Sequence, residues 1–119
     1  MKNTLIIGAT TNKERYAYKA AERLTKAGHD IIPFGIKKGV VFGKNIINDW
    51  EDFKDIDTVT LYVGPERQID YIERIISIKP KRVIFNPGTE NFEFQSRLNK
   101  EGIEFEEACT LVLLSLDKY

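Results

Sequence analysis

The chain has 119 residues, which corresponds to one domain able to bury a core without disulfides or a structural metal. Its 18 basic and 18 acidic residues cancel, which argues against a nucleic-acid-binding protein, because such proteins usually carry a net basic face. The single cysteine and single histidine exclude an internal disulfide and argue against a transition-metal site. No secretory signal layout is present, and no apolar run approaches the roughly 20 residues of a membrane span, so a cytoplasmic protein without a membrane contact is expected.

The first part of the chain alternates between strand and helix patterns. Residues 3–8 are a short apolar run, typical of a strand buried on both faces. Apolar side chains at helical spacing predict a helix over 13–27, which Gly28 ends. Residues 30–34 predict a second strand, in which Pro33 would remove one ladder hydrogen bond unless it lies at the strand end.

The middle of the chain is less regular. Residues 36–47 are rich in Gly and Lys, with a short extended piece expected at 40–42. Residues 49–53 predict a single helical turn, because Trp50 and Phe53 are spaced one turn apart.

The remaining segments again alternate strand with helix. Pro65 begins a helix, because proline at the first helical position loses only an N–H that has no partner anyway. The expected strands are 58–63, 82–85 and 103–105, and the expected helices are 65–77, 90–100 and 108–116.

This order predicts a single α/β domain over residues 1–119: a Rossmann-like, doubly wound, five-stranded parallel sheet in three α/β/α layers. In such sheets the ligand crevice lies beyond the carboxyl ends of the strands, at the topological switch point. The loops 8–12, 64–65 and 86–89 are expected to meet there, with Lys37 and Lys38 at the flank.

The turn from Gly8 to Asn12 is the most informative stretch for function. A buried strand, a tight turn with hydroxyl side chains and a helix N-terminus together form an anion site. A phosphate is expected on Thr10, Thr11 and the neighbouring amides, aided by Lys13 and Arg15. The alternative is that Thr and Asn side chains only cap the helix. The three-glycine dinucleotide fingerprint is absent.

Four further loop residues are candidates for ligand contact. Lys37 follows the second strand, where a basic residue favours a ligand with a phosphate on its ribose, such as NADP or coenzyme A; the alternative is a solvated lysine. Pro65 either only begins its helix or also presents an apolar edge to an adenine. Asn86 and Gly88 form either an ordinary turn or a contact at the switch point.

Little in the sequence indicates catalysis. No nucleophile elbow, Walker loop, Cys-x-x-Cys or metal motif is present, so no catalytic residue and no metal ligand is expected. Cys109 is interpreted as a buried inert thiol and His29 as a surface residue at a helix end. Of Tyr16 and Tyr18, one is expected to pack against the helix while the other faces the ligand.

The sequence resembles the small stand-alone CoA-binding domain proteins, relatives of the CoA-binding domain of the succinyl-CoA synthetase α subunit. The resemblance covers nearly the whole chain. The segments that carry it are Ile6-Ile7-Gly8-Ala9-Thr10-Thr11, Lys13, Arg15, Tyr18, Gly28 to Phe34, Lys37, Gly43, Asp57-Thr58-Val59, Val63, Pro65, Val83 to Asn86, Gly102-Ile103 and Cys109.

The resemblance implies a set of coenzyme A contacts. Gly8, Thr10 and Thr11 would hold the pyrophosphate, with Arg15 nearby. Lys37 would contact the 3′-phosphate side of the ADP moiety. Val63 and Pro65 would border the adenine or the pantetheine, and Asn86 and Gly88 would line the crevice floor.

The chain also departs from the family pattern. It has Gly35-Ile36-Lys37 where the family usually has Asn-Pro-Lys, Asn86 where Gln is common, and Thr11 where Ser is common. The synthetase reaction uses a phosphorylated histidine and a grasp domain, which this chain is too short to contain, and His29 lies in the wrong place to replace that histidine.

Three functions follow as hypotheses. The first is non-catalytic binding of coenzyme A or an acyl-CoA, a small nucleotide ligand. The second is an NADP-binding oxidoreductase domain that uses the same turn. The third is a protein-interaction domain that has lost its ligand, with the apolar side chains of Leu113 and Leu116 indicating a homodimer or partner face.

Overall fold

The computed structural model describes residues 1–119 as one five-stranded parallel sheet covered by helices, which confirms the predicted fold class. The strand order is β2-β1-β5-β6-β7, and every neighbouring pair is parallel. The strands of this sheet are β1 (Asn3–Ile7), β2 (Asp30–Phe34), β5 (Thr58–Leu61), β6 (Arg82–Phe85) and β7 (Glu104–Glu107). A separate hairpin pairs β3 (Val40–Val41) with β4 (Lys44–Asn45), and the helices are α1 (Tyr16–Lys26), α2 (Pro65–Gln68), α3 (Ile72–Ile78), α4 (Phe92–Lys100) and α5 (Thr110–Ser115).

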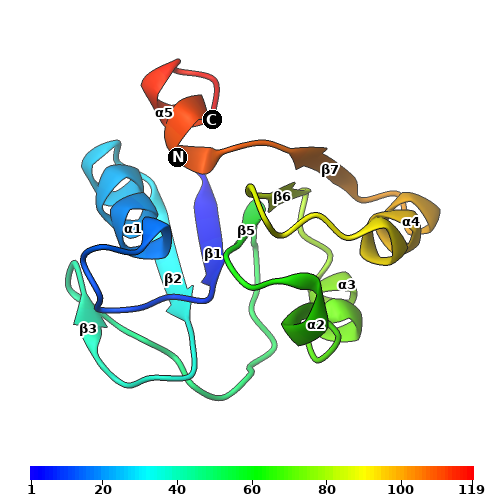
Figure 1. Ribbon diagram of the computed structural model, residues 1–119, viewed down its shortest axis with the longest axis horizontal. Coiled ribbons are helices and arrows are strands. Elements are labelled where there is room, and N and C mark those ends of the chain that lie inside the picture. Colours follow the sequence, from blue (N-terminus) through cyan, green and yellow to red (C-terminus); the bar gives the residue numbers. More distant parts are fainter.

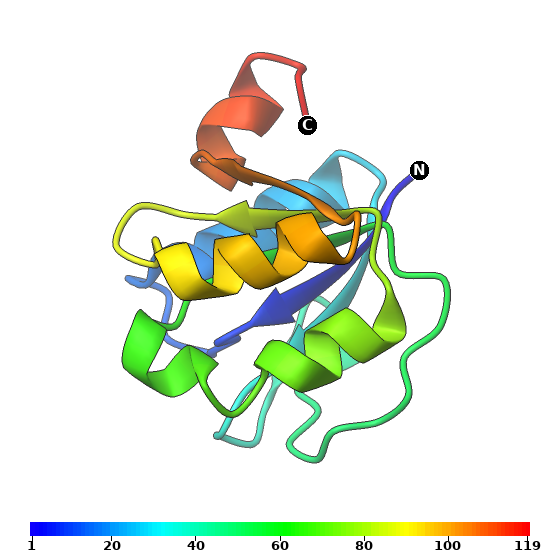
Figure 2. The ribbon, with the colours of Figure 1, turned by 90° about the vertical axis from the view of Figure 1, so that its right-hand side faces the viewer.

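The helices form a layer on each face of the sheet (Figure 1). On one face α1 packs against β2 and α5 lies beside α1, with Ile6, Leu24 and Ile31 in one buried cluster between α1 and the sheet. On the other face α3 and α4 pack over the sheet, as Figure 2 shows, where Ile75 and Phe94 join a larger cluster. The central strands β1, β5 and β6 are almost entirely buried, as expected of strands covered on both faces, whereas the edge strand β7 is charged and largely exposed.

Pro33 lies within β2 and is paired in register with Ile6. The sheet accepts it because β2 is an edge strand, so one side of this strand does not need the missing N–H. The carbonyl of Pro33 instead accepts from the N–H of Ile47 at 2.9 Å, which ties the segment after β4 to the sheet.

Two predicted helices differ from the structure. The first begins at Tyr16 rather than residue 13, because Thr10 and Asn12 fold the preceding chain into side-chain turns. The predicted helix over 65–77 is instead the two short helices α2 and α3, separated by residues 69–71.

The helical turn predicted at 49–53 is wrong. This segment has no helix, and Trp50 and Phe53 contact each other with ring centroids 5.0 Å apart. Both rings also pack on Phe34, at 5.4 and 6.4 Å, so their burial against the sheet explains the spacing that resembled a helix. None of the helices in the structure has the length and apolar character needed to cross a membrane.

Candidate functional site

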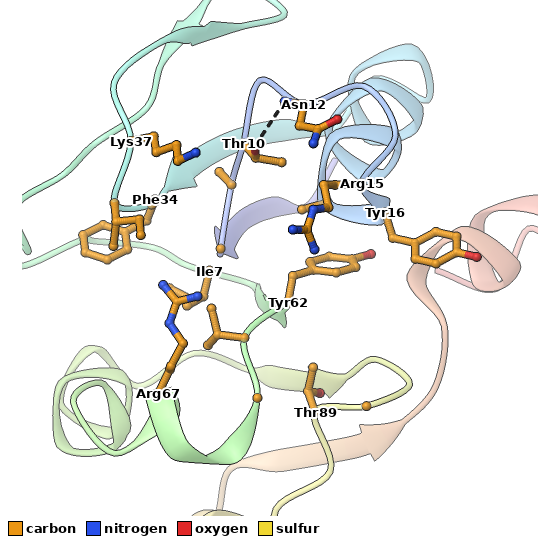
Figure 3. A pocket seen from close by; sticks show the side chains of 18 of the residues that line it. Ile7, Thr10, Asn12, Arg15, Tyr16, Phe34, Lys37, Tyr62, Arg67 and Thr89 are labelled. Atoms are coloured by element: carbon orange, nitrogen blue, oxygen red, sulfur yellow. Dashed lines mark hydrogen bonds between the residues drawn. The ribbon is translucent and has the colours of Figure 1, made fainter.

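A cavity of about 460 Å³ lies beyond the carboxyl ends of the central strands. It sits at the switch point, where the chain leaves β1 for one face of the sheet and β5 for the other. The loops after β1, β2, β5 and β6 surround it (Figure 3). Its lining residues are Ile7, Gly8, Ala9, Thr10, Asn12, Arg15, Tyr16, Ala17, Phe34, Gly35, Ile36, Lys37, Tyr62, Val63, Gly64, Arg67, Tyr71, Pro87, Gly88 and Thr89.

The tight turn after β1 is fixed by the neighbouring strand. The N–H groups of Gly8 and Ala9 both donate to the carbonyl of Phe34 at 2.9 Å. Gly8 has φ +99°, and a side chain there would press on Tyr62 and Val63 at about 3 Å, so this position needs glycine. Gly35 is equally constrained, because an added Cβ would collide with the Ala9 carbonyl. The amides of Gly8 and Ala9 are therefore already used within the fold.

The free donors come from the start of α1 instead. The Thr10 hydroxyl accepts the N–H of Asn12 at 3.1 Å, and the Asn12 side chain accepts the N–H of Glu14 at 3.0 Å. The N–H groups of Tyr16 and Ala17, both in the cavity wall, donate to no acceptor in the protein. An anion in the cavity could accept from them, aided by the helix dipole.

The loop that carries Lys37 is held in place at several points. The Asn48 side chain donates to the carbonyls of Gly35 and Lys37 at 2.7 and 3.0 Å, and the Gly35 N–H donates to the Ile47 carbonyl at 3.0 Å. Figure 3 shows the Lys37 side chain directed into the cavity, towards Thr10. A loop ordered before the ligand arrives loses less conformational entropy on binding.

The cavity wall is cationic. Arg15, Lys37 and Arg67 line it, and no Asp or Glu does. None of these three side chains forms an ion pair, whereas Arg82 and Arg97 are each paired with a glutamate. Because the whole chain has no net charge, this excess of positive charge is local to the cavity.

The structure brings seven of the twelve predicted site residues to the cavity and leaves five outside it. Those in the wall are Gly8, Ala9, Thr10, Arg15, Lys37, Val63 and Gly88. Those outside are Thr11, Lys13, Tyr18, Pro65 and Asn86.

Each residue outside the cavity has another position or role. Thr11 lies over Gly39, and Lys13 is exposed in the turn before α1. Tyr18 packs on Phe42 at 5.0 Å, and the exposed Tyr16 ring points away from the cavity (Figure 3), so neither of these two rings is directed into it, although Tyr16 belongs to the cavity wall. Pro65 is the exposed first residue of α2.

Asn86 is buried beneath the cavity and its side chain is fully used by the fold. Its Nδ2 donates to Thr60 Oγ1 at 2.6 Å and to the Leu61 carbonyl at 2.8 Å, while its Oδ1 accepts the N–H of Thr110 at 2.9 Å. This network joins β5, β6 and α5, which explains the polar residue at this strand end.

Several residues of the wall were not predicted from the sequence, notably Tyr62, Arg67 and Tyr71, and Thr89 was expected there only as part of the loop 86–89. Tyr62 directly follows β5, so its place at a strand end was a usable signal. Arg67 gave no signal, because a charged residue within an expected helix is most simply a solvated one. Its approach to the cavity depends on how α2 is placed.

Tyr62 has an unusual environment. Its ring lines the cavity, while its hydroxyl is buried without a hydrogen-bond partner. Burial raises the pKa of this phenol from 10.0 to about 12, although the nearby hydroxyls of Thr110 and Thr60 act in the opposite direction.

Neither the cysteine nor the histidine lies in the cavity wall. Cys109 is half-buried just before α5. His29 accepts the backbone N–H of Lys2 at 3.0 Å and packs on Tyr119, at the opposite end of β1 from the cavity. Burial, the N-terminal amine and Lys2 lower its pKa below 6.5. No group of three or more His, Cys, Asp or Glu residues in the structure is arranged to hold a metal ion.

Comparisons with known proteins agree with this architecture. A crystal structure of an uncharacterized protein is 55% identical, covers 100% of this chain and 98% of that chain, and superposes with a TM-score of 0.98. A hypothetical protein from Pyrococcus horikoshii OT3 is 27% identical over 93% of this chain and 80% of that chain, with a TM-score of 0.84. No curated protein gave a significant match.

A larger protein shares the fold alone. The dinucleotide-forming acetyl-coenzyme A synthetase 1 of Ca. Korarchaeum cryptofilum, in complex with phosphate and ADP, is 14% identical, with a TM-score of 0.72. The match covers 90% of this chain but only 25% of that chain. A family model described as a CoA binding domain matches residues 2–115. Since that model spans nearly the whole chain, the protein belongs to the CoA binding domain family.

Proposed function

We propose that this protein is a non-catalytic module that binds coenzyme A or an acyl-CoA in the cavity at the switch point. Coenzyme A carries a pyrophosphate and a ribose 3′-phosphate, so it is strongly anionic. The proposal places the pyrophosphate beside the free N–H groups of Tyr16 and Ala17, with the Arg15 guanidinium as its counter-charge.

The main support is the charge of the cavity wall, which has three unpaired cations and no acid. A neutral protein with such a local excess suits a polyanionic ligand, and membership of the CoA binding domain family narrows the ligand to coenzyme A. The volume of about 460 Å³ is within the usual range for ligand pockets.

Isothermal titration with coenzyme A tests the proposal, and the chain offers two matched controls. Arg15→Gln and Lys37→Gln each remove a cation from the wall, whereas Lys13→Gln and Lys38→Gln remove exposed neighbours that lie outside it. The first two variants should weaken binding about tenfold, as expected for losing a hydrogen bond to a charged group, and the controls should match the wild type. Absence of binding by the wild type to coenzyme A, acetyl-CoA and dephospho-CoA would overturn the proposal.

The second candidate is an NADP-binding oxidoreductase domain, which Lys37 favours through its place after β2. Trp50 provides a reporter, because it packs on Phe34, which lines the cavity. If NADPH quenches Trp50 fluorescence at lower concentration than coenzyme A does, this candidate replaces the first.

The third candidate is a partner-binding domain without a small ligand. The exposed side chains of Val112 and Leu116 on and after α5 favour it. Light scattering over a range of protein concentrations would detect a homodimer, and it would decide for this candidate only if both nucleotides fail to bind.

A further inference from the structure

Arg67 is the cavity cation that neither the sequence pattern nor the family resemblance indicated. It lies on α2, is exposed to solvent, and forms no ion pair. A free guanidinium in the wall of a cavity without acids has no partner in the protein, so its charge is available to a ligand.

The three cations divide the cavity into two ends. Figure 3 shows Arg15 beside Tyr62 and Tyr16, whereas Lys37 and Arg67 come from opposite walls on the side of Phe34. The connectivity supports this division. Tyr71, one turn beyond Arg67, contacts Phe34 with ring centroids 5.5 Å apart, and Lys37 follows Phe34 by three residues.

Arg67 is also held in place by its neighbours. The backbone N–H of Arg67 donates to the Gly64 carbonyl at 3.1 Å. The adjacent Gln68 is completely buried, and its Nε2 donates to the carbonyls of Val63 and Thr89 at 2.8 and 2.7 Å. These bonds fix α2 against the loops after β5 and β6, so the base of the Arg67 side chain has a defined position at the cavity.

The two cationic ends suit a ligand with two separate phosphate groups. The end near α1 has free N–H groups and one arginine, which suits a pyrophosphate. The other end has a lysine and an arginine beside aromatic side chains, which suits a terminal phosphate attached to a nucleoside.

We infer that Arg67, together with Lys37, binds the ribose 3′-phosphate of coenzyme A and makes the site prefer coenzyme A to dephospho-CoA. This inference rests on the proposed function. It assigns the specificity of the site to a residue of α2 as well as to the loop after β2.

The test measures the dissociation constants of coenzyme A and dephospho-CoA for the wild type, Arg67→Gln and Arg67→Lys. Arg74→Gln, an exposed arginine on α3 outside the cavity wall, is the control. Arg67→Gln should weaken coenzyme A binding about tenfold and leave dephospho-CoA binding within about twofold, because only the former carries the phosphate. Arg67→Lys should fall between the wild type and Arg67→Gln, and Arg74→Gln should match the wild type.

Other outcomes separate this inference from the proposed function. Equal weakening of both ligands by Arg67→Gln, as expected if the guanidinium stacks on the adenine, overturns the inference and leaves coenzyme A binding intact. Unchanged binding of both ligands also overturns it. If the wild type binds neither ligand, the proposed function fails as well. Equal thermal unfolding midpoints of wild type and variants show that the fold is preserved.

Discussion

At the scale of single residues, Tyr62 combines an apolar ring in the cavity wall with a buried hydroxyl that has no partner. Such a hydroxyl lowers stability relative to an apolar group, because it has exchanged bonds with water for none in the protein. The Thr60 hydroxyl below it is different, since it accepts from Asn86 and bonds to Thr110. Removing the hydroxyl at these two neighbouring positions should therefore have different effects on the free energy of unfolding.

We expect Tyr62→Phe to change the free energy of unfolding by less than about 0.5 kcal/mol or to raise it, and Thr60→Val to lower it by about 1–3 kcal/mol. Urea unfolding measures both. The raised pKa gives a second readout: the unfolded chain loses the Tyr62 proton first, so the free energy of unfolding is unaffected by this group below pH 10.0 and decreases as the pH rises towards about 12. The difference in ultraviolet titration between wild type and Tyr62→Phe should have its midpoint near 12, and a midpoint at 10 would contradict the buried hydroxyl.

His29 predicts a pH dependence at the other end of β1. Its lowered pKa means that the unfolded chain takes up a proton first as the pH falls, so stability is complete above 6.5 and decreases below it. Protonation also removes the acceptor for the Lys2 N–H. The wild type should therefore lose more stability than His29→Gln between about pH 7.5 and about pH 5, measured by urea unfolding. Parallel pH profiles of the two proteins would refute this role.

At the scale of elements, the break between α2 and α3 lets Gln68 reach the loops around the cavity. Its side chain bonds to Val63 and Thr89 and accepts from Asn91 Nδ2 at 2.9 Å, and it is completely buried. In the continuous helix predicted over 65–77, Gln68 would have no special structural role. The glutamine instead joins α2 to the start of α4.

Gln68→Ala should lower the free energy of unfolding by about 2–3 kcal/mol, because it leaves buried carbonyls without donors. Asp70→Ala, an exposed change in the link between α2 and α3, should cost less than about 0.5 kcal/mol. Thermal and urea unfolding of the two variants decide the matter. Equal stabilities would mean that water replaces the lost bonds and that Gln68 does not anchor α2.

The elements also show how far local patterns reach. The strands were predictable because apolar runs such as Leu5 to Ile7 must be buried on both faces. The helical turn at 49–53 was wrong because an apolar pair three residues apart packs equally well from an extended segment onto Phe34. The late start of α1 follows from the side chains of Thr10 and Asn12, which accept hydrogen bonds from the backbone N–H groups of Asn12 and Glu14. At the start of a helix these N–H groups would have no partner within the helix.

At the scale of the whole molecule, the candidate site was predictable in position but only partly in composition. The switch point follows from strand order, and residues at strand ends, such as Gly8 and Val63, follow with it. The use of the Gly8 and Ala9 amides by Phe34 was not predictable, since it depends on how closely β2 approaches the turn. Arg67 likewise depends on the placement of α2 on the far face of the sheet.

The charge distribution leads to a prediction for the intact molecule. The net charge is zero, so little long-range steering of an anion is expected, and the attraction should come from the three cavity cations alone. Salt screens such exposed charges, with a Debye length near 10 Å at about 0.1 M and near 3 Å at about 1 M. Raising sodium chloride from about 50 mM to about 500 mM should therefore weaken coenzyme A binding several-fold.

The slope of this salt dependence should decrease stepwise as the cavity cations are removed. The double variant Arg15→Gln with Lys37→Gln should show a shallower salt dependence than the wild type. The double variant Lys13→Gln with Lys38→Gln should keep the wild-type slope. Each double variant removes two positive charges, but only the first pair lines the cavity. Titration calorimetry at several salt concentrations provides the slopes. Identical slopes for the two double variants would show that the ligand responds to the overall charge of the protein and not to the cations of this cavity.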